Sequence, residues 1–458
     1  MKKIRFLIAL WSAKASRILM KVLGRNATYL PGKIAMKLCP DFLKMLPHPK
    51  TVVAVTGTNG KTTVSNLLSD LLKQNGYTVT NNSFGSNVQA GVVTALIADA
   101  SLSGKAKKDI AVLEVDERSS LLIYPHYKPD FLLCNNIMRD SIKRNAHTGF
   151  ISYIISSALP EETKLILNAD DLICATLGPQ CKDRTYFGIS ANKPDQNARQ
   201  FLSDIVYCPN CGEKLESDYL RYNHIGRMHC PKCGTGSPAP DFLVTEIDEQ
   251  NGTFTLQHDG KEMKCKLIND NIVNVYNFCG AVALLSRLGL SDQKIMGSFE
   301  AMQIVKTRYE VIKSGNLNIT MLMAKGQNPI ACARCYDYVA KLPGENKGLV
   351  IIVDDLGDNI NNSESTCWLY DCDYSYLSDP SIGQIVFGGP RSKDQYLRAV
   401  LAGVDPEKIR IADSSAHASD ALDTDTYHDV YVLYELYRAP DAAVNKQALI
   451  KRGEGEKV

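Results

Sequence analysis

The chain has 458 residues, of which 45% are hydrophobic and 22% are charged, and its formal net charge at pH 7 is +2. These values predict a globular protein of two or three domains and argue against nucleic acid as a partner. The 14 cysteines lack the spacing of a secreted disulfide framework, so we expect a reducing, cytoplasmic environment.

The first fifty residues form a basic leader, with eleven Lys or Arg against one acid, Asp41. Four apolar side chains in it share one face at helical spacing: Ile4, Leu7, Ile8 and Trp11. Two interpretations follow. Either the leader lies on an anionic membrane surface at the inner face of the membrane, or it packs as a helix on the next domain with its basic side in solvent. No segment has the run of about eighteen uncharged apolar residues that predicts a membrane span.

A parallel sheet with crossover helices is predicted after the leader. Residues 51–56 (TVVAVT) read as a buried strand, followed by a glycine-rich loop and a helix that ends at Gly76. Further strands, with helices between them, are expected at 109–114, 130–134 and 164–168. An insertion at 205–236 interrupts this pattern. Residues 241–268 then alternate like antiparallel strands, and 272–289 have helical spacing.

A second α/β unit is predicted from about residue 305. Its expected strands lie at 317–323, 348–353, 384–387, 409–411 and 430–433. The predicted organisation is a leader (1–50), a central domain (51–304) and a C-terminal, Rossmann-like α/β domain (305–458).

The loop at 57–63 has the sequence and the context of a phosphate-binding loop. It lies between a predicted strand and a predicted helix, where glycines let backbone amides face phosphate oxygens and the helix dipole favours negative charge. Lys61 would reach the terminal phosphates, and the Thr62 hydroxyl would ligate Mg²⁺. The chain is therefore predicted to bind a nucleoside triphosphate through Thr58, Asn59, Gly60, Lys61, Thr62 and Thr63.

Acidic residues follow the next expected strand, which reads LEVDERSS from Leu113. They fall at the carboxyl edge of the sheet, where ligands of open α/β sheets gather. Magnesium prefers a few carboxylates together with phosphate oxygens, so Glu114 and Glu117 are candidate ligands of the ion that Thr62 contacts. The alternative is a solvated acidic turn.

Four cysteines in the insertion have the spacing C-x₂-C-x₁₈-C-x₂-C, which predicts a zinc ribbon. Four thiolates close a tetrahedral zinc and leave no position for water, so the zinc would be structural; nucleic-acid or redox use is the alternative. His224 and His229 could compete as ligands, and Cys332-x-x-Cys335 is expected to be helical and incidental. The predicted ligands are Cys208, Cys211, Cys230 and Cys233.

Three stretches resemble the Mur ligase superfamily of ATP-dependent ligases. They are VTGTNGKTT (55–63), LILNADD (165–171) and NIVNVYNFCGAVAL (271–284). The resemblance implies that Asn274 and Asn277 contact the adenine of ATP and that Arg308 approaches the transferred phosphate. Ordinary helix capping is the alternative role for the two asparagines.

The four-cysteine insertion narrows the resemblance to the MurT family. CWLYDCDYSYL (367–377) and RSKDQYLRAVLAGVD (391–405) are similar to stretches of that family. The resemblance implies that the chain activates the D-glutamate α-carboxylate of the lipid II stem peptide by phosphoryl transfer. Lys61, Glu114 and Arg308 would serve this step. Ammonia from a GatD-type glutamine amidotransferase subunit would then give D-isoglutamine.

The stretch VDDLGDNINNSESTCW (353–368) departs from the family pattern, in which an aspartate of this region completes the catalytic triad of the partner. Asp371 is the first candidate for that aspartate, with Asp358 and Asp355 as alternatives. The alternative role for Asp371 is a purely structural one, as a cap or an ion-pair partner. Two other functions stay open. The chain could be a ligase that adds an amino acid, as Mur and folylpolyglutamate ligases do, or a non-catalytic nucleotide-binding regulatory subunit.

Overall fold

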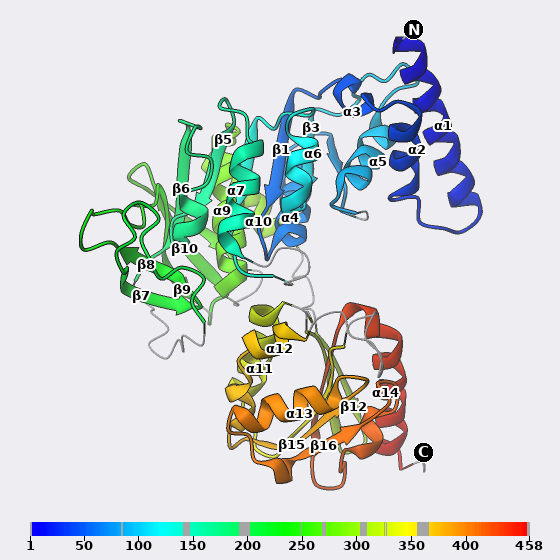
Figure 1. Cartoon of the computed structure of the whole chain (residues 1–458), viewed down its shortest axis with the longest axis vertical. Helices are drawn as coiled ribbons and strands as arrows, with labels where there is room; N and C mark the ends of the chain where they lie inside the picture. Colours follow the sequence, from blue (N-terminus) through cyan, green and yellow to red (C-terminus); the bar gives the residue numbers. More distant parts are fainter. Residues whose placement is uncertain are drawn as a thin grey trace. The chain divides into compact units, whose positions relative to one another are not determined.

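The computed structural model describes residues 2–83, 86–140, 147–191, 202–248, 250–267, 272–302, 309–324, 326, 328–354 and 366–455. The chain divides into two compact units, drawn in Figure 1. The first contains residues 1–138 and 147–304, and the second contains residues 139–146 and 305–458. No helix among the described residues is long and apolar enough to cross a membrane.

The first unit is built on a nine-stranded sheet with the order β11-β10-β9-β6-β5-β4-β1-β3-β2. The strands from β2 to β9 in this order pair in parallel, and β9, β10 and β11 pair antiparallel. Their bounds are β1 Thr51–Thr56, β2 Val79–Asn81, β3 Ile110–Glu114, β4 Phe131–Cys134, β5 Lys164–Asn168, β6 Arg184–Ile189, β9 Phe242–Asp248, β10 Thr253–His258 and β11 Lys261–Lys266. The buried central strands are mostly apolar, with polar side chains only at their ends, as expected for a sheet covered on both faces.

Helices cover both faces of this sheet. α4 (Lys61–Gln74), α9 (Ile272–Arg287) and α10 (Asp292–Ala301) pack on one face. The core on the other face includes side chains of α1 (Lys2–Val22), α2 (Leu30–Leu38), α3 (Phe42–Met45), α5 (Gln89–Asp99), α6 (Ser120–Ile123), α7 (Thr148–Ala158) and α8 (Leu172–Ala175). A short 3-10 helix, Glu117–Ser119, precedes α6. The basic leader therefore belongs to the first unit, where Lys14 Nζ donates to the Ile97 and Ala100 carbonyls, both at 2.8 Å.

The insertion contains a separate hairpin, β7 (Glu216–Tyr222) paired antiparallel with β8 (Ile225–His229). Its turn is made by Asn223 and His224, and Asn223 adopts a left-handed conformation with φ of 49°. The two pairs of cysteines flank the open end of the hairpin, so the turn and the cysteines lie at opposite ends of it.

The second unit has a six-stranded sheet with the order β12-β13-β17-β14-β15-β16, parallel except for the β12–β13 hairpin. Its strands are β12 Tyr309–Ser314, β13 Leu317–Met323, β14 Lys347–Ile352, β15 Ile382–Gly388, β16 Ile409–Ala412 and β17 Asp429–Tyr434. One core holds side chains of α11 (Pro329–Lys341), α12 (Cys367–Asp371) and α13 (Ser392–Leu401), and the other holds those of α14 (Ala439–Gly453). Short 3-10 helices span Tyr374–Ser378, Pro406–Lys408, Ala418–Ala421 and Leu436–Arg438.

The strands expected from apolar runs are confirmed within two residues in both units, and Cys332 and Cys335 lie in helix α11 as predicted. Strands β2, β6 and β12, and strands β7 and β8 of the insertion, were not predicted. β2 has only three residues, and β6 contains Arg184 and two tyrosine or threonine side chains that interrupt its apolar pattern. These segments become strands because partner strands satisfy their backbone groups.

Candidate nucleotide site and metal centre

The phosphate-binding loop connects β1 to α4 at the carboxyl edge of the sheet in the first unit. Gly57 and Gly60 have φ angles of 121° and 89°, which side chains other than glycine rarely adopt. A Cβ atom at Gly57 would collide with the Asn136 carbonyl oxygen, and one at Gly60 would collide with the Asn277 carboxamide. The two glycines are therefore required by conformation and by space together.

A segment after β4, residues 135–138, forms the wall against which the loop packs. The Thr58 hydroxyl donates to the Met138 carbonyl at 3.0 Å and accepts from the Met138 amide at 2.9 Å. The side chain of Asn136 accepts from the Asn59 amide at 2.9 Å and donates to the Asn59 carbonyl at 3.0 Å. These reciprocal hydrogen bonds fix the loop conformation without using the Lys61 side chain.

Lys61, the first residue of α4, holds its ammonium group over the loop. Its Nζ donates to the Gly57 carbonyl at 2.5 Å and forms an ion pair with Glu117 Oε1 at 2.7 Å. The side chains are only 11% and 2% exposed, so this pair is shielded from solvent. Glu117 thus forms an ion pair with Lys61, the lysine that was predicted to reach the phosphates. The role of Glu117 as a magnesium ligand stays a prediction.

The other predicted magnesium ligands lie at the same edge of the sheet. Glu114 ends β3 and is buried, and its Oε1 accepts from the Asn87 side chain at 3.1 Å. Thr62 is exposed in the first turn of α4. The amides at the start of a helix, a lysine and an exposed threonine suit the phosphates of a nucleotide, and the buried carboxylate of Glu114 suits a Mg²⁺ ion.

The two asparagines predicted at the adenine lie on α9, beside the loop. Asn277 is buried, accepts from the Asn135 side chain at 2.5 Å and donates to the Asn274 side chain at 3.2 Å. Asn277 thus occupies the space beside Gly60 that a side chain there would need. This position gives Asn277 a part in the shape of the loop, and the adenine contact stays a prediction.

Sequence reasoning missed several polar residues that support the site. Asn135 and Asn136 directly follow the buried strand β4, and that placement at the carboxyl edge was the signal that could have identified them. Asp170 and Asp171 were recognised only as part of a motif. Asp170 accepts from the Tyr276 hydroxyl at 2.7 Å, and burial raises the pKa of its carboxyl.

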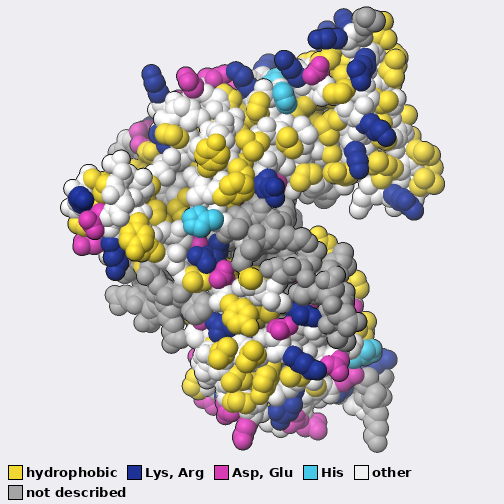
Figure 2. Space-filling model, in the orientation of Figure 1, with side chains coloured by type: hydrophobic (Ala, Val, Ile, Leu, Met, Phe, Trp, Pro, Cys, Tyr) yellow, Lys and Arg dark blue, Asp and Glu magenta, His cyan; other side chains and the backbone are white. Residues whose placement is uncertain are grey.

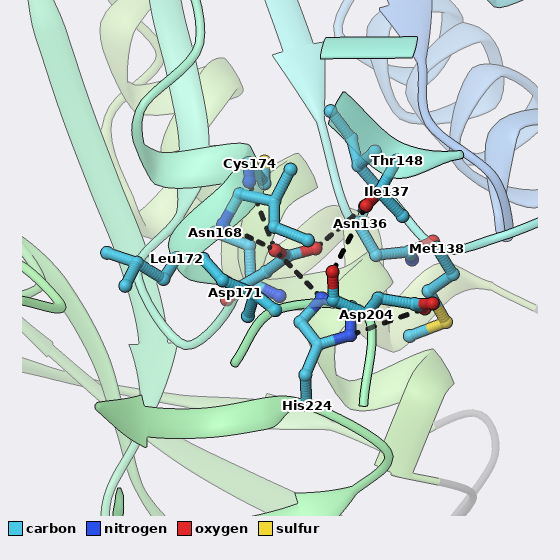
Figure 3. A network of polar contacts seen from close by, with 12 residues as sticks. Asn136, Ile137, Met138, Thr148, Asn168, Asp171, Leu172, Cys174, Asp204 and His224 are labelled. Atoms are coloured by element: carbon cyan, nitrogen blue, oxygen red, sulfur yellow. Dashed lines mark hydrogen bonds and ion pairs between the residues drawn. The ribbon is translucent and has the colours of Figure 1, made fainter. Parts of the chain in front are cut away.

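His224 lies in a buried polar network and bonds to two acids (Figure 3). Its Nε2 lies 3.1 Å from Asp171 Oδ1, and its Nδ1 lies 3.6 Å from Asp204 Oδ2. The suggestion that His224 could compete as a zinc ligand is therefore wrong. His229, the other suggested competitor, lies 2.9 Å from Asp218 and 3.4 Å from Glu216.

The four cysteines of the insertion come together as one cluster, with all four sulfur atoms within 4.8 Å of one another. Cys208 and Cys233 have sulfurs 3.5 Å apart, as do Cys211 and Cys230. Zinc–sulfur bonds of about 2.3 Å in a tetrahedron place sulfurs at about this separation, so the cluster fits the ion. Among the described residues this is the one group of at least three potential ligands that is compact enough to hold a metal.

The two halves of the cluster have the same backbone geometry. The amides of Gly212 and Gly234 donate to the carbonyls of Cys208 and Cys230, and both glycines have φ near 72°. The hydrogen bond between Cys233 and the Thr235 hydroxyl lowers the pKa of the Cys233 thiol to about 6. At Cys211 a hydrogen bond with the Glu213 backbone lowers the pKa, but desolvation and hydrogen bonds with the other three thiols outweigh it and raise the pKa to about 12. The thiolate form that binds metals is therefore favoured at Cys233 and not at all four cysteines.

In the second unit, Asp371 ends helix α12 and lies 3.3 Å from Arg139, with its side chain 25% exposed. Arg398 holds the end of this helix by donating to the Leu369 and Cys372 carbonyls at 3.2 and 3.1 Å. Arg308, Asp355 and Asp358 lie outside the described residues.

Comparison with solved structures shows which fold the chain has. A pseudomurein peptide ligase type C from Methanothermus fervidus matches with a TM-score of 0.67 and 22% identity, covering 90% of this chain and 81% of the other. MurF from Acinetobacter baumannii matches with a TM-score of 0.61 and 17% identity over 92% and 80% of the two chains. The Mur ligase middle domain matches residues 55–213. The fold is that of the Mur ligases, with a C-terminal α/β domain.

The family follows from closer relatives. The MurT ligase C-terminal family matches residues 326–438. The MurT subunit of lipid II isoglutaminyl synthase (glutamine-hydrolyzing) from Staphylococcus aureus strain COL is 31% identical over 87% of this chain and 88% of its own. The subunit of the same name from Streptococcus pneumoniae strain R6 is 27% identical over 93% of each chain. The chain belongs to the MurT family.

Replacing Cys208 with Ser tests the metal centre. One thiolate ligand is lost, so the zinc content of the purified protein should fall at least about tenfold by elemental mass spectrometry. Hydrogen exchange should accelerate around the cysteines, while the affinity for ATP should change by less than about threefold, because the hairpin turn is anchored separately. Cys367→Ser, at an exposed cysteine of the second unit, is the matched control. Catalysis lost with fold and ATP binding intact would overturn the structural role of the zinc.

Proposed function

We propose that the protein amidates the α-carboxylate of the D-glutamate in the lipid II stem peptide, using ATP and ammonia. The observation that carries this proposal is the match to MurT subunits of lipid II isoglutaminyl synthase over about nine-tenths of both chains. Because the MurT ligase C-terminal family matches residues 326–438 of the second unit, the proposal differs from that for an ordinary Mur ligase, such as the one whose sequence match covers 26% of this chain. The geometry of the phosphate-binding loop supports the use of ATP.

The reaction we propose has two steps. A carboxylate oxygen attacks the γ-phosphorus of ATP, the bond from that phosphorus to the ADP oxygen breaks, and an acyl phosphate forms. Ammonia then attacks the acyl carbon, phosphate leaves, and the amide nitrogen loses a proton. Phosphorylation is needed because a free carboxylate is a poor electrophile.

Residues of this chain would neutralise charge during the phosphoryl transfer. Lys61 would exchange its contact with the Gly57 carbonyl for a phosphate oxygen, and Glu117 would keep the ammonium oriented. Thr62 and Glu114 would hold Mg²⁺, which offsets the charge of the phosphates. Arg308 would approach the transferred phosphoryl group, and Asn274 and Asn277 would face the adenine.

The proposed partner is a GatD-type glutamine amidotransferase subunit that releases the ammonia. Its support is that the relatives are named as subunits of a glutamine-hydrolysing enzyme. Asp371 would complete the triad of that partner, with Asp355 and Asp358 as alternatives. The partly exposed carboxylate of Asp371 at a helix end, oriented by Arg139, is accessible to a second protein.

We also propose that helix α1 rests on the anionic inner surface of the membrane that carries the substrate. The helix has two apolar stripes. Phe6, Ala9, Leu10 and Ala13 are buried in the first unit, whereas a second stripe remains exposed: Ile4, Ile8, Trp11, Ile18, Leu19 and Val22. At about 100° per residue, Ile18 lies half a turn of the helix away from Ala9, so the stripes face opposite sides. The exposed stripe spans roughly 27 Å of helix, because each residue adds about 1.5 Å.

The charges around this stripe favour lipid headgroups as its partner. Figure 2 shows hydrophobic side chains interspersed with Lys and Arg over α1. Lys2, Lys3, Arg5, Lys21 and Arg25 are exposed, and no acid occurs before Asp41. The buried face of α1 explains how the helix folds, and the exposed apolar and basic face is typical of helices at an anionic interface. Under this proposal both interpretations of the leader apply, each to one side of the helix.

An assay with lipid II, ATP, Mg²⁺ and ammonium salt tests the reaction. The wild-type chain should produce ADP and amidated lipid II, detected by mass spectrometry. Lys61→Ala should lower the rate by at least about 100-fold, because it removes a charge from the developing transition state. Lys73→Ala, at an exposed lysine of the same helix, should have the wild-type rate. Turnover with an amino acid but not with ammonia would favour the rival ligase, and ATP binding without any turnover would favour a regulatory subunit.

Asp371→Asn tests the partner triad. With the glutaminase partner present, glutamine-dependent amidation should fall by at least about 100-fold, because the imidazole of the partner would lose its orienting carboxylate. Ammonium-dependent amidation should stay within about twofold of wild type, because Asp371 lies in the second unit, outside the phosphate-binding loop. Asp420→Asn, at a half-exposed acid of the same unit, is the control. Equal loss with both nitrogen sources would refute the triad role of Asp371.

Vesicle sedimentation tests the membrane surface of α1. The protein should bind vesicles that contain phosphatidylglycerol, and 0.5 M salt or pure phosphatidylcholine should weaken binding at least about tenfold. Replacing Ile4, Ile8 and Ile18 with Ser should weaken it by a similar factor, because these side chains would enter the interface. Leu401→Ser, at an exposed leucine of α13, should bind like wild type. Dimers in ultracentrifugation that the triple variant abolishes would instead identify the stripe as a contact between copies.

A further inference from the structure

The turn of the inserted hairpin is tied into the first unit by a histidine and two acids (Figure 3). The His224 side chain is fully buried, with Asp171 at 3.1 Å and Asp204 at 3.6 Å. The neighbouring Asn223 side chain donates to the same Asp204 carboxylate at 2.9 Å. The acids come from separate segments of the chain, so the turn is held from two sides.

Asp171 also bonds to the core of the site. Its Oδ1 caps helix α8 by accepting from the Ile173 and Cys174 amides, both at 3.0 Å. Its Oδ2 accepts from the Ile137 amide at 2.7 Å. Asp171 therefore binds His224 and the wall segment 135–138 through one carboxylate group.

The wall segment completes the connection to the phosphate-binding loop. The residue after Ile137 is Met138, whose amide and carbonyl both bond to the Thr58 hydroxyl. The residue before it is Asn136, which bonds to Asn59 in both directions. Asp171 thus bonds to the wall segment at Ile137, between the two residues that contact the phosphate-binding loop.

We propose that His224 is a positioning residue for ATP, which acts through Asp171 and the wall segment to hold the phosphate-binding loop in its binding conformation. The inserted hairpin then has two separate tasks. Its cysteines hold its outer end together, and its turn supports the nucleotide site. This inference rests on the proposed use of ATP and assigns a role to a residue outside the loop itself.

The charge of His224 strengthens its contacts with Asp171 and Asp204. Burial alone would lower the pKa of His224, but the charge of Asp171 and the hydrogen bonds with Asp171 and Asp204 raise it to about 9. Among the described residues, these two acids are the groups that form ion pairs with His224. Because the folded pKa lies above the ordinary value of 6.5, the stabilisation is fully present below about pH 6.5 and is lost as the pH rises through about 9.

Calorimetry of ATP binding to the full chain tests the proposal. His224→Leu removes the donor to Asp171 and should weaken ATP binding about tenfold, the cost of losing a hydrogen bond to a charged group. The KM for lipid II and the zinc content should not change. His224→Gln retains an N–H donor and should stay within about threefold of wild type. His229→Gln, at a half-exposed histidine of the same hairpin, is the matched control.

A second measurement covers the case in which His224→Leu does not fold. Between pH 6.5 and 10 the ATP affinity of the wild type should fall more steeply than that of His224→Gln, which has no proton to lose there. Identical pH profiles, or a lower melting temperature of His224→Leu with unchanged ATP affinity, would overturn the positioning role. Wild-type protein that does not bind ATP would instead contradict the proposed function.

Discussion

The packing of the phosphate-binding loop against residues 135–138 is the constraint on which the nucleotide site depends. The loop has no space for side chains at Gly57 and Gly60, and its polar groups bond to Asn136 and Met138 in both directions. This arrangement leaves the Lys61 ammonium to an ion pair with Glu117. Fixed backbone donors at a helix start need no rearrangement when charge develops on a phosphate, and such preorganisation is a major source of catalytic rate enhancement.

The insertion shows how one short hairpin can serve two physical purposes. A cluster of four cysteines that fits a metal ion would replace the hydrophobic core that a segment of this size cannot build. The opposite end relies on burial of a histidine that hydrogen-bonds to Asp171 and forms a longer ion pair with Asp204, so that the two carboxylates offset its charge. The two ends of the hairpin are thus stabilised by different interactions, so a substitution at one end need not destabilise the other.

The leader helix α1 also has two regions with different roles, but these lie on its opposite faces and not at its two ends. Side chains at positions 6, 9, 10 and 13 complete the core on one face of the large sheet. Those at 4, 8, 11, 18, 19 and 22 are each more than half exposed. A helix needs one apolar stripe to fold onto a domain, so a second stripe with basic neighbours suggests a second surface to bind.

The sequence alone determined the features that depend on local spacing. Apolar runs located most strands, glycines between a strand and a helix located the phosphate-binding loop, and paired cysteines located the four-cysteine cluster, because backbone geometry within a few residues fixes each of these. Only the tertiary structure decided which distant side chains meet. His224 lies 53 residues from Asp171 and Asn277 lies 142 residues from Asn135, and no periodicity relates such positions. The same limit applied to α1, because both of its stripes satisfy helical spacing and only the packed domain decides which one is buried.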